Sequence, residues 1–130
     1  MENQVYRILV VDDEPDLHDL FKKRFRELVK QGTHIFEFAS NGQEALDLIK
    51  SEKIFHLLFT DISMPVMDGW EFLEEYALLK PKIDKQITIY IITSSVSPED
   101  ILRAKKNKEV TDYLIKPITK DNFIALLKKL

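Results

Sequence analysis

The sequence has no cysteine and very little glycine. With no Cys, disulfides, thiolate zinc sites, iron–sulfur clusters and cysteine nucleophiles are excluded, which suits a reducing compartment. The 3 glycines form no glycine-rich phosphate-binding loop of the P-loop type. Nucleotide binding of that kind is therefore not expected.

A basic excess and long apolar runs are missing as well. Lys and Arg number 19 against 22 Asp and Glu, whereas nucleic-acid-binding domains usually carry a clear excess of positive charge. The longest apolar runs, such as residues 89–92, are far too short to cross a bilayer, and residues 1–4 do not resemble a signal peptide. We expect a cytoplasmic protein without direct nucleic-acid binding or membrane insertion.

The composition that remains is typical of a compact domain. Hydrophobic residues make up 45% and charged residues 32% of 130 residues, so the chain can bury a core of its own. No repeat, low-complexity stretch or linker interrupts it. We expect one domain spanning residues 1–130.

Short apolar runs alternate with amphipathic segments along the chain. Strands are predicted at residues 7–11, 35–39, 57–60, 87–92 and 112–115, and most are continuous apolar runs of the kind buried in parallel sheets. The order βαβαβαβαβα predicts an α/β, flavodoxin-like (βα)5 doubly wound fold. Its five-stranded parallel sheet would have strand order 2-1-3-4-5 and helices on both faces.

Five helices are predicted between and after these strands. The second begins at Asn41, a good N-cap, and the fourth at Ser97, which precedes a proline and two acidic residues. The third covers about residues 69–79, and the first ends before Gly32. The first helix is expected to bury Leu17, Leu20, Phe21, Phe25 and Leu28, and the last Phe123, Leu126, Leu127 and Leu130.

Side chains of functional types follow four of the five predicted strands. Asp12 and Asp13 follow the first strand, Asp61 the third, Thr93 the fourth and Lys116 the fifth. Because ligands of open α/β sheets bind beyond the carboxyl ends of the strands, these side chains should converge. Three clustered carboxylates repel one another, so a hard divalent cation with oxygen ligands is expected between them, and Mg²⁺ is favoured.

Each of these residues also has an ordinary explanation on its own. An aspartate after a strand is often a helix cap or a turn residue, a threonine there often bonds to backbone, and a lysine is usually solvated. Only the joint pattern, with the right residue type at four strand ends, favours a functional site.

The motifs at these strand ends resemble those of the receiver domain of two-component response regulators, in the chemotaxis-regulator-like superfamily. The resemblance covers nearly the whole chain. It is carried by residues 8–15 (ILVVDDEP), 61–69 (DISMPVMDG), 91–95 (IITSS) and 113–117 (YLIKP).

This resemblance implies a role for each matching residue. Asp61 would be the phosphoacceptor, and Mg²⁺, with Mn²⁺ as a substitute, would be bound by Asp12, Asp13, Asp61 and the backbone carbonyl of Ser63. Thr93 and Lys116 would contact the phosphoryl group. Tyr113 would act with Thr93 as a switch, and the Lys116–Pro117 peptide bond would be cis.

The implied function is a stand-alone receiver domain of a phosphorelay, not an enzyme beyond its own phosphorylation and slow autodephosphorylation. The phosphodonor would be a sensor histidine kinase or a histidine phosphotransfer protein. Phosphorylation would switch partner binding through the face of helix four, strand five and helix five. The protein would be a monomer or a phosphorylation-dependent dimer.

Two other functions are weighed against this one. A phosphate-ester hydrolase with an aspartyl-phosphate intermediate would place a second acid two residues after the nucleophile, where this chain has Ser63. A binding module that has lost phosphorylation would not need the complete set of site residues. Ser94 departs from the alanine that many receivers carry there, and His18, His34 and His56 are expected to be surface or packing residues.

Overall fold

The computed structural model describes residues 5–129. Its strands are β1 (Tyr6–Val11), β2 (His34–Ala39), β3 (Leu57–Thr60), β4 (Thr88–Thr93) and β5 (Val110–Ile115). Its helices are α1 (Pro15–Arg24), α2 (Arg26–Lys30), α3 (Gly42–Lys50), α4 (Gly69–Leu79), α5 (Pro98–Lys106) and α6 (Lys120–Leu127), with a 3₁₀ turn, η1 (Lys80–Lys82). All predicted strands are present, and their bounds differ from the predicted ones by at most two residues.

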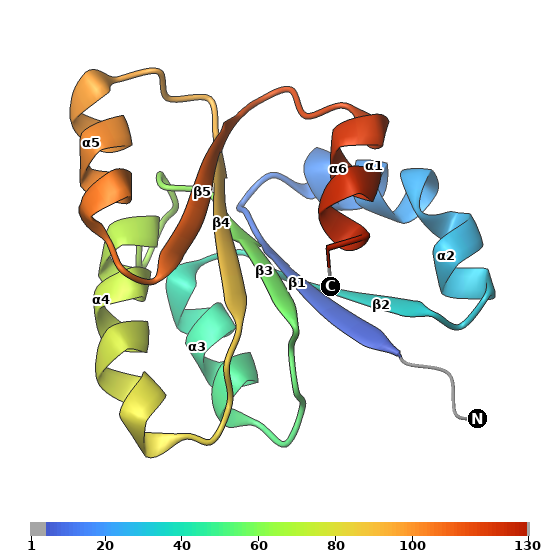
Figure 1. Ribbon diagram of the computed structural model, residues 1–130, viewed down its shortest axis with the longest axis horizontal. Helices are drawn as coiled ribbons and strands as arrows, with labels where there is room; N and C mark the ends of the chain where they lie inside the picture. The colour runs from blue at the N-terminus through green and yellow to red at the C-terminus, as the bar shows by residue number, and fades with distance from the viewer. Residues whose placement is uncertain (1–4, 130) are drawn as a thin grey trace.

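The five strands form one parallel sheet in the order β2-β1-β3-β4-β5. Helices α3, α4 and α5 lie on one side of it and α1, α2 and α6 on the other (Figure 1). The predicted flavodoxin-like fold is confirmed.

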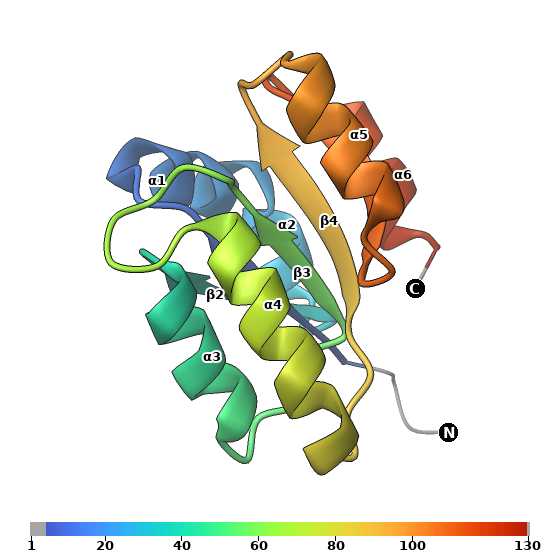
Figure 2. The same ribbon diagram turned by 90° about the vertical axis from the view of Figure 1, so that its left-hand side faces the viewer.

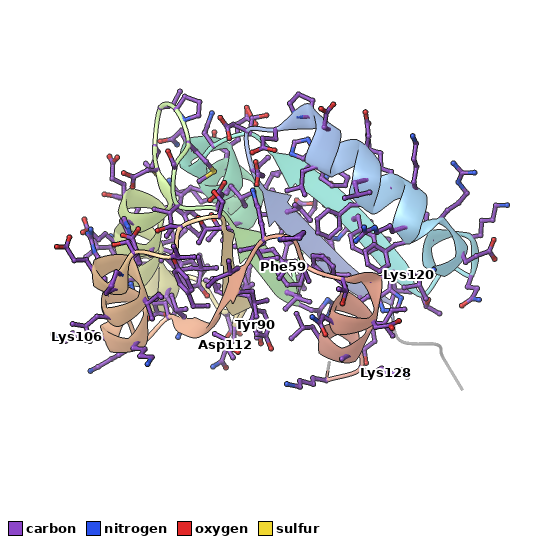
Figure 3. All side chains as sticks on the ribbon, turned by 90° about the horizontal axis from the view of Figure 1, so that it is seen from above. Phe59, Tyr90, Lys106, Asp112, Lys120 and Lys128 are labelled. Atoms are coloured by element: carbon purple, nitrogen blue, oxygen red, sulfur yellow. The ribbon has the colours of Figure 1, made fainter. Side chains whose placement is uncertain are left out.

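Alternating residues of each strand supply two apolar cores, one on each face of the sheet. Leu9 and Val11 point to the core under α3 and α4, whereas Ile8 and Val10 point to the opposite core. The second core is rich in aromatic rings, and Phe59 and Tyr90 stack in it with centroids 5.7 Å apart (Figure 3). The sheet is thus buried on both faces, as the continuous apolar strands predict.

The first predicted helix is wrong in one respect, because it is two helices. Phe25 leaves the helical conformation at φ −111° and ψ 19°, and its ring stacks on Phe36 at 5.3 Å in the core. The helix breaks where this ring packs against β2. The apolar pattern of the sequence continues through Phe25 and does not predict the break. Leu20, expected to be buried, is 40% exposed. The helices predicted fourth and fifth are therefore α5 and α6, and Leu130 lies outside the described residues.

The predicted helix ends are confirmed by their hydrogen bonds. The side chains of Asn41 and Ser97 accept bonds from Glu44 N–H and Asp100 N–H at the starts of α3 and α5. Gly32 follows α2 with φ +73°, a left-handed conformation that glycine adopts without strain. Within residues 5–129, no helix has the length and apolar character that a bilayer span requires.

Candidate functional site

Two aspartates emerge side by side at the carboxyl edge of the sheet. Val11 and Thr60 are register partners on β1 and β3, so the residues after them, Asp12 and Asp61, are neighbours. Their backbone N–H groups donate to the carbonyl oxygens of Ala39 at 2.9 Å and Val11 at 3.0 Å, which continues the strand ladder. Asp12 is 2% and Asp61 9% exposed, whereas Asp13 faces solvent. The parallel sheet therefore buries two carboxylates at one edge.

A lysine from the end of β5 lies between these buried carboxylates. Lys116 Nζ is 2.8 Å from Asp12 Oδ2 and 3.2 Å from Asp61 Oδ2, with Glu14 Oε1 farther away at 3.9 Å. Burial disfavours the ammonium, but Asp12 and Asp61 outweigh burial and raise the pKa of Lys116 above its ordinary value. Lys116 is therefore a fixed cation at neutral pH.

The end of β4 adds a buried hydroxyl that is linked to a tyrosine of β5 through Ser95. Thr93 is 3% exposed, and its Oγ1 accepts a bond from Ser95 N–H at 3.3 Å. Tyr113 on β5 is half-buried and donates its hydroxyl to the carbonyl oxygen of Ser95 at 2.9 Å. Ser95 in turn donates to Asp100 Oδ2 at 2.6 Å at the start of α5. One loop residue thus joins β4, β5 and α5.

The loop between β3 and α4 packs tightly behind Asp61. Ile62 N–H donates to Asp61 Oδ1 at 2.7 Å, and Gly69 N–H donates to Ile62 O at 2.7 Å. A Cβ atom at Gly69 would overlap the carbonyl oxygen of Asp61, so only glycine fits there. Ser63 is exposed in this loop, and Val66 has a positive φ of 67°. The Lys116–Pro117 peptide bond is cis, as the resemblance implies.

Comparisons with known proteins agree with this geometry. The family profile of the response regulator receiver domain matches residues 8–128. A response regulator receiver protein of Anaeromyxobacter sp. (strain Fw109-5) is 33% identical over 120 residues, which cover 92% of this chain and 46% of that protein. The chain belongs to the response regulator receiver family.

Two further relatives show how far this likeness extends. An uncharacterized 14.6 kDa protein of Leptolyngbya boryana is 34% identical over 122 residues, covering 94% of this chain and 87% of that one. The crystal structure of a CheY-like receiver domain from Methanospirillum hungatei JF-1 is 25% identical, with a TM-score of 0.80 over 97% of this chain and 93% of that one. The receiver domain thus spans less than half the Anaeromyxobacter protein and most of the Leptolyngbya protein.

The acidic cluster of this receiver domain fits the Mg²⁺ that receiver domains generally bind. One carboxylate oxygen from each of Asp12, Asp13 and Asp61 lies within 4.8 Å of the others. Ligand oxygens of an octahedral Mg²⁺ are about 3.0 Å apart when adjacent and about 4.2 Å apart when opposite, so rotations of these side chains would bring ligands from the cluster into range. The donor set is all oxygen, which Mg²⁺ and Mn²⁺ prefer.

Two residues near the cluster were not assigned to the site from the sequence. His18, expected to be a surface or packing residue, bonds through Nε2 to the backbone carbonyl oxygen of Asp12 at 2.8 Å. Glu14 lies at the edge of the cluster, 3.9 Å from Lys116 Nζ. No motif could have identified His18, because its contact depends on how α1 lies against the end of β1.

Proposed function

We propose that this receiver domain accepts a phosphoryl group on Asp61 from a phosphohistidine. The donor would be a sensor histidine kinase or a histidine phosphotransfer protein. The observation that carries the proposal is the position of Asp61, a nearly buried carboxylate with Lys116 Nζ 3.2 Å from one oxygen and two further aspartates beside it. A carboxylate is already ionised at neutral pH, so Asp61 needs no general base.

The transfer exchanges one bond to phosphorus for another. An oxygen of Asp61 forms a bond to phosphorus while the phosphorus–nitrogen bond of the donor breaks, and the bonding pair stays on the imidazole nitrogen. In-line placement and charge stabilisation are the protein's main contributions to such a reaction. Lys116 balances charge on the phosphoryl oxygens, and Thr93 donates its hydroxyl to one of them.

Mg²⁺ is part of this proposal, with Mn²⁺ as a substitute. Asp12, Asp13, Asp61 and the backbone carbonyl of Ser63 would hold it, with Asp13 as a direct ligand because its carboxylate is the exposed one. The bound ion supplies positive charge for the phosphoryl oxygens. Asp12 would assist through water, since it is the most buried of the three carboxylates and Lys116 Nζ is already 2.8 Å from its Oδ2.

Phosphorylation would change how the surface formed by α5, β5 and α6 binds a partner protein. These elements follow one another along one side of the molecule, where Lys106, Asp112 and Lys128 are labelled in Figure 3. Helix α5 buries only Ala104, and β4 is visible between it and α4 in Figure 2. The guanidinium carbon of Arg103 on α5 lies 4.6 Å from the ring centroid of Trp70 on α4. A helix held this lightly shifts at low energetic cost.

Phosphorylation would act on this surface through Thr93 and Tyr113. An acyl phosphate on Asp61 attracts the Thr93 hydroxyl, whose Oγ1 now accepts the bond from Ser95 N–H. Ser95 also forms hydrogen bonds with Tyr113 and Asp100. A shift of this loop would therefore change the position of the Tyr113 side chain and of α5 together. The phosphorylated state is then favoured by the extra contacts made in one conformation.

A small phosphodonor tests the proposal without the natural partner. Incubation with acetyl phosphate and Mg²⁺, followed by intact-protein mass spectrometry, should show the addition of one phosphoryl group per chain. When excess EDTA is present during the incubation, most of this phosphorylation should not occur. A protein that stays unmodified with Mg²⁺ present, while remaining folded by circular dichroism, would contradict the proposal.

The switch is tested separately with beryllofluoride, which mimics a phosphoryl group. Proton–nitrogen NMR spectra with and without it should differ at the amides of Ser95 and Tyr113 and along α5. The Tyr113→Phe variant should bind the mimic equally well but show smaller shifts along α5. If the spectra change only around Asp61, the switch is not built on Tyr113.

The remaining parts of the proposal concern the whole protein. We propose that residues 1–130 act as one receiver domain in the cytoplasm. Its form would be a monomer or a phosphorylation-dependent dimer. Light scattering with and without beryllofluoride distinguishes these two forms.

A further inference from the structure

The backbone of Asp12 is held by a histidine that has no assigned role. His18 lies on α1, and its Nε2 is 2.8 Å from the carbonyl oxygen of Asp12. A carbonyl oxygen can only accept, so Nε2 carries the hydrogen and donates it. The ring is half-buried and lies on Phe38 of β2, with centroids 4.8 Å apart, which restricts its orientation.

This bond completes a full set of partners around Asp12. Its N–H donates to Ala39 O at 2.9 Å, its Oδ1 accepts from Glu14 N–H at 2.9 Å, and its Oδ2 accepts from Lys116 Nζ at 2.8 Å. His18 supplies the remaining contact, to the backbone oxygen. Asp12 is therefore fixed in both its side chain and its main chain.

Asp13 is the opposite case. Among residues 5–129, the structure gives its carboxylate no hydrogen bond and no ion pair, and the side chain is exposed. Its position is therefore set by its backbone alone. The carbonyl group of Asp12 and the N–H of Asp13 belong to one planar peptide unit, so a bond that fixes the first also orients the second.

We propose that His18 is a positioning residue for the metal site. Its Nε2–H fixes the Asp12–Asp13 peptide plane and thereby aims the carboxylate of Asp13 at the cation. Nε2 is occupied by the carbonyl, and His18 is not part of the acidic cluster, so it acts through the backbone and not as a ligand. This inference rests on the proposed use of Mg²⁺ by the cluster.

Three substitutions separate the hydrogen bond from ring packing. His18→Phe keeps a ring against Phe38 and removes the donor. His18→Gln places an amide N–H at about the reach of Nε2, whereas the shorter His18→Asn cannot reach the carbonyl. Phe36→Leu serves as the control, because it loosens the packing of β2 against Phe21 and Phe25 and leaves the Phe38 ring under His18 in place.

Mg²⁺ affinity of the metal-free protein, measured by isothermal titration calorimetry, is the main readout. We expect His18→Phe and His18→Asn to weaken Mg²⁺ binding by about tenfold, the usual effect of losing a contact behind a metal ligand. His18→Gln should restore most of the affinity. Phe36→Leu should lower the thermal stability but leave the affinity within about twofold of the parent.

A second readout reports on the peptide plane itself. In NMR spectra recorded without metal, the Asp13 amide should shift in His18→Phe and stay close to its parent position in His18→Gln. The inference is overturned if the affinity of His18→Phe is unchanged, or if all variants lose affinity in proportion to their loss of stability. If the parent protein itself binds no Mg²⁺, the proposed metal site is wrong. His18 then has only a structural role.

Discussion

Lys116 Nζ and Asp12 Oδ2 lie 2.8 Å apart although the two residues are 104 positions apart in the sequence. This contact joins the end of β5 to the end of β1 across the site, and the same ammonium also reaches Asp61. The carboxylates at this edge are therefore partly neutralised before any metal or phosphoryl group arrives. Several consequences of this arrangement can be measured.

Replacing Lys116 should destabilise the metal-free protein. In Lys116→Met, the buried carboxylates of Asp12 and Asp61 face each other without a cation. Removing one partner of a buried ion pair costs on the order of 3 kcal/mol. Urea unfolding in EDTA should show this loss, and the exposed Lys106→Met should show almost none. Equal stability of the two variants would mean that Lys116 contributes no net stabilisation.

The same contact predicts a dependence on pH. Because the pKa of Lys116 is raised in the folded state, its stabilising contribution is complete below the ordinary lysine value of 10.5. It is lost as the pH rises through the higher folded value. The gap in unfolding free energy between parent and Lys116→Met should therefore be constant at neutral and mildly alkaline pH and shrink above pH 10.5. If this gap widens with rising pH, the pKa of Lys116 is lowered and not raised in the folded state.

Asp13 should have opposite effects on stability and on metal binding. Without metal its exposed charge lies beside two other carboxylates, so Asp13→Asn should stabilise the protein slightly, by about 0.5 kcal/mol. Removing a direct ligand should weaken Mg²⁺ binding by at least about tenfold. Asp16→Asn, another exposed acid at the start of α1, is the control: it should leave Mg²⁺ binding unchanged and lower stability slightly, because a negative charge in the first turn favours the helix. A clear loss of metal-free stability in Asp13→Asn would argue against repulsion in the cluster.

Gly69 should tolerate no side chain. A Cβ atom there would overlap Asp61 O and lie 2.9 Å from Ile62 Cα, and both are backbone atoms that cannot move aside cheaply. Gly69→Ala should therefore lose at least about 2 kcal/mol of unfolding free energy, against the helix propensity that favours alanine. Thermal unfolding, with Ala77→Gly as a measure of propensity alone on the same helix, checks this. Increased stability of Gly69→Ala would mean that the loop relaxes.

The sequence predicts the fold well because its signals are local. Continuous apolar runs mark the strands buried on both faces, and Asn41 and Ser97 begin helices where side-chain caps are expected. The apolar pattern does not predict the break at Phe25, since the break accompanies the packing of this ring on Phe36, a contact with β2. The exposure of Leu20 is not predicted either, because periodicity does not say how wide the buried face of a helix is.

The site was predictable only in part. Strand order and register place Asp12, Asp61 and Lys116 at one edge, and the structure brings them together as expected. The contact of His18 with Asp12 depends on the angle at which α1 leaves the sheet, which no residue pattern specifies. The link from Tyr113 through Ser95 to Asp100 likewise depends on the path of a loop.

The most direct test of the account is to locate the phosphoryl group. After treatment with acetyl phosphate and Mg²⁺, reduction with borohydride converts an aspartyl phosphate to homoserine, which peptide mass spectrometry can place in the sequence. We predict homoserine at position 61 in the parent protein and at no position in Asp61→Asn. Homoserine at position 12 or 13, or unchanged phosphorylation of Asp61→Asn, would contradict the assignment of Asp61 as the acceptor.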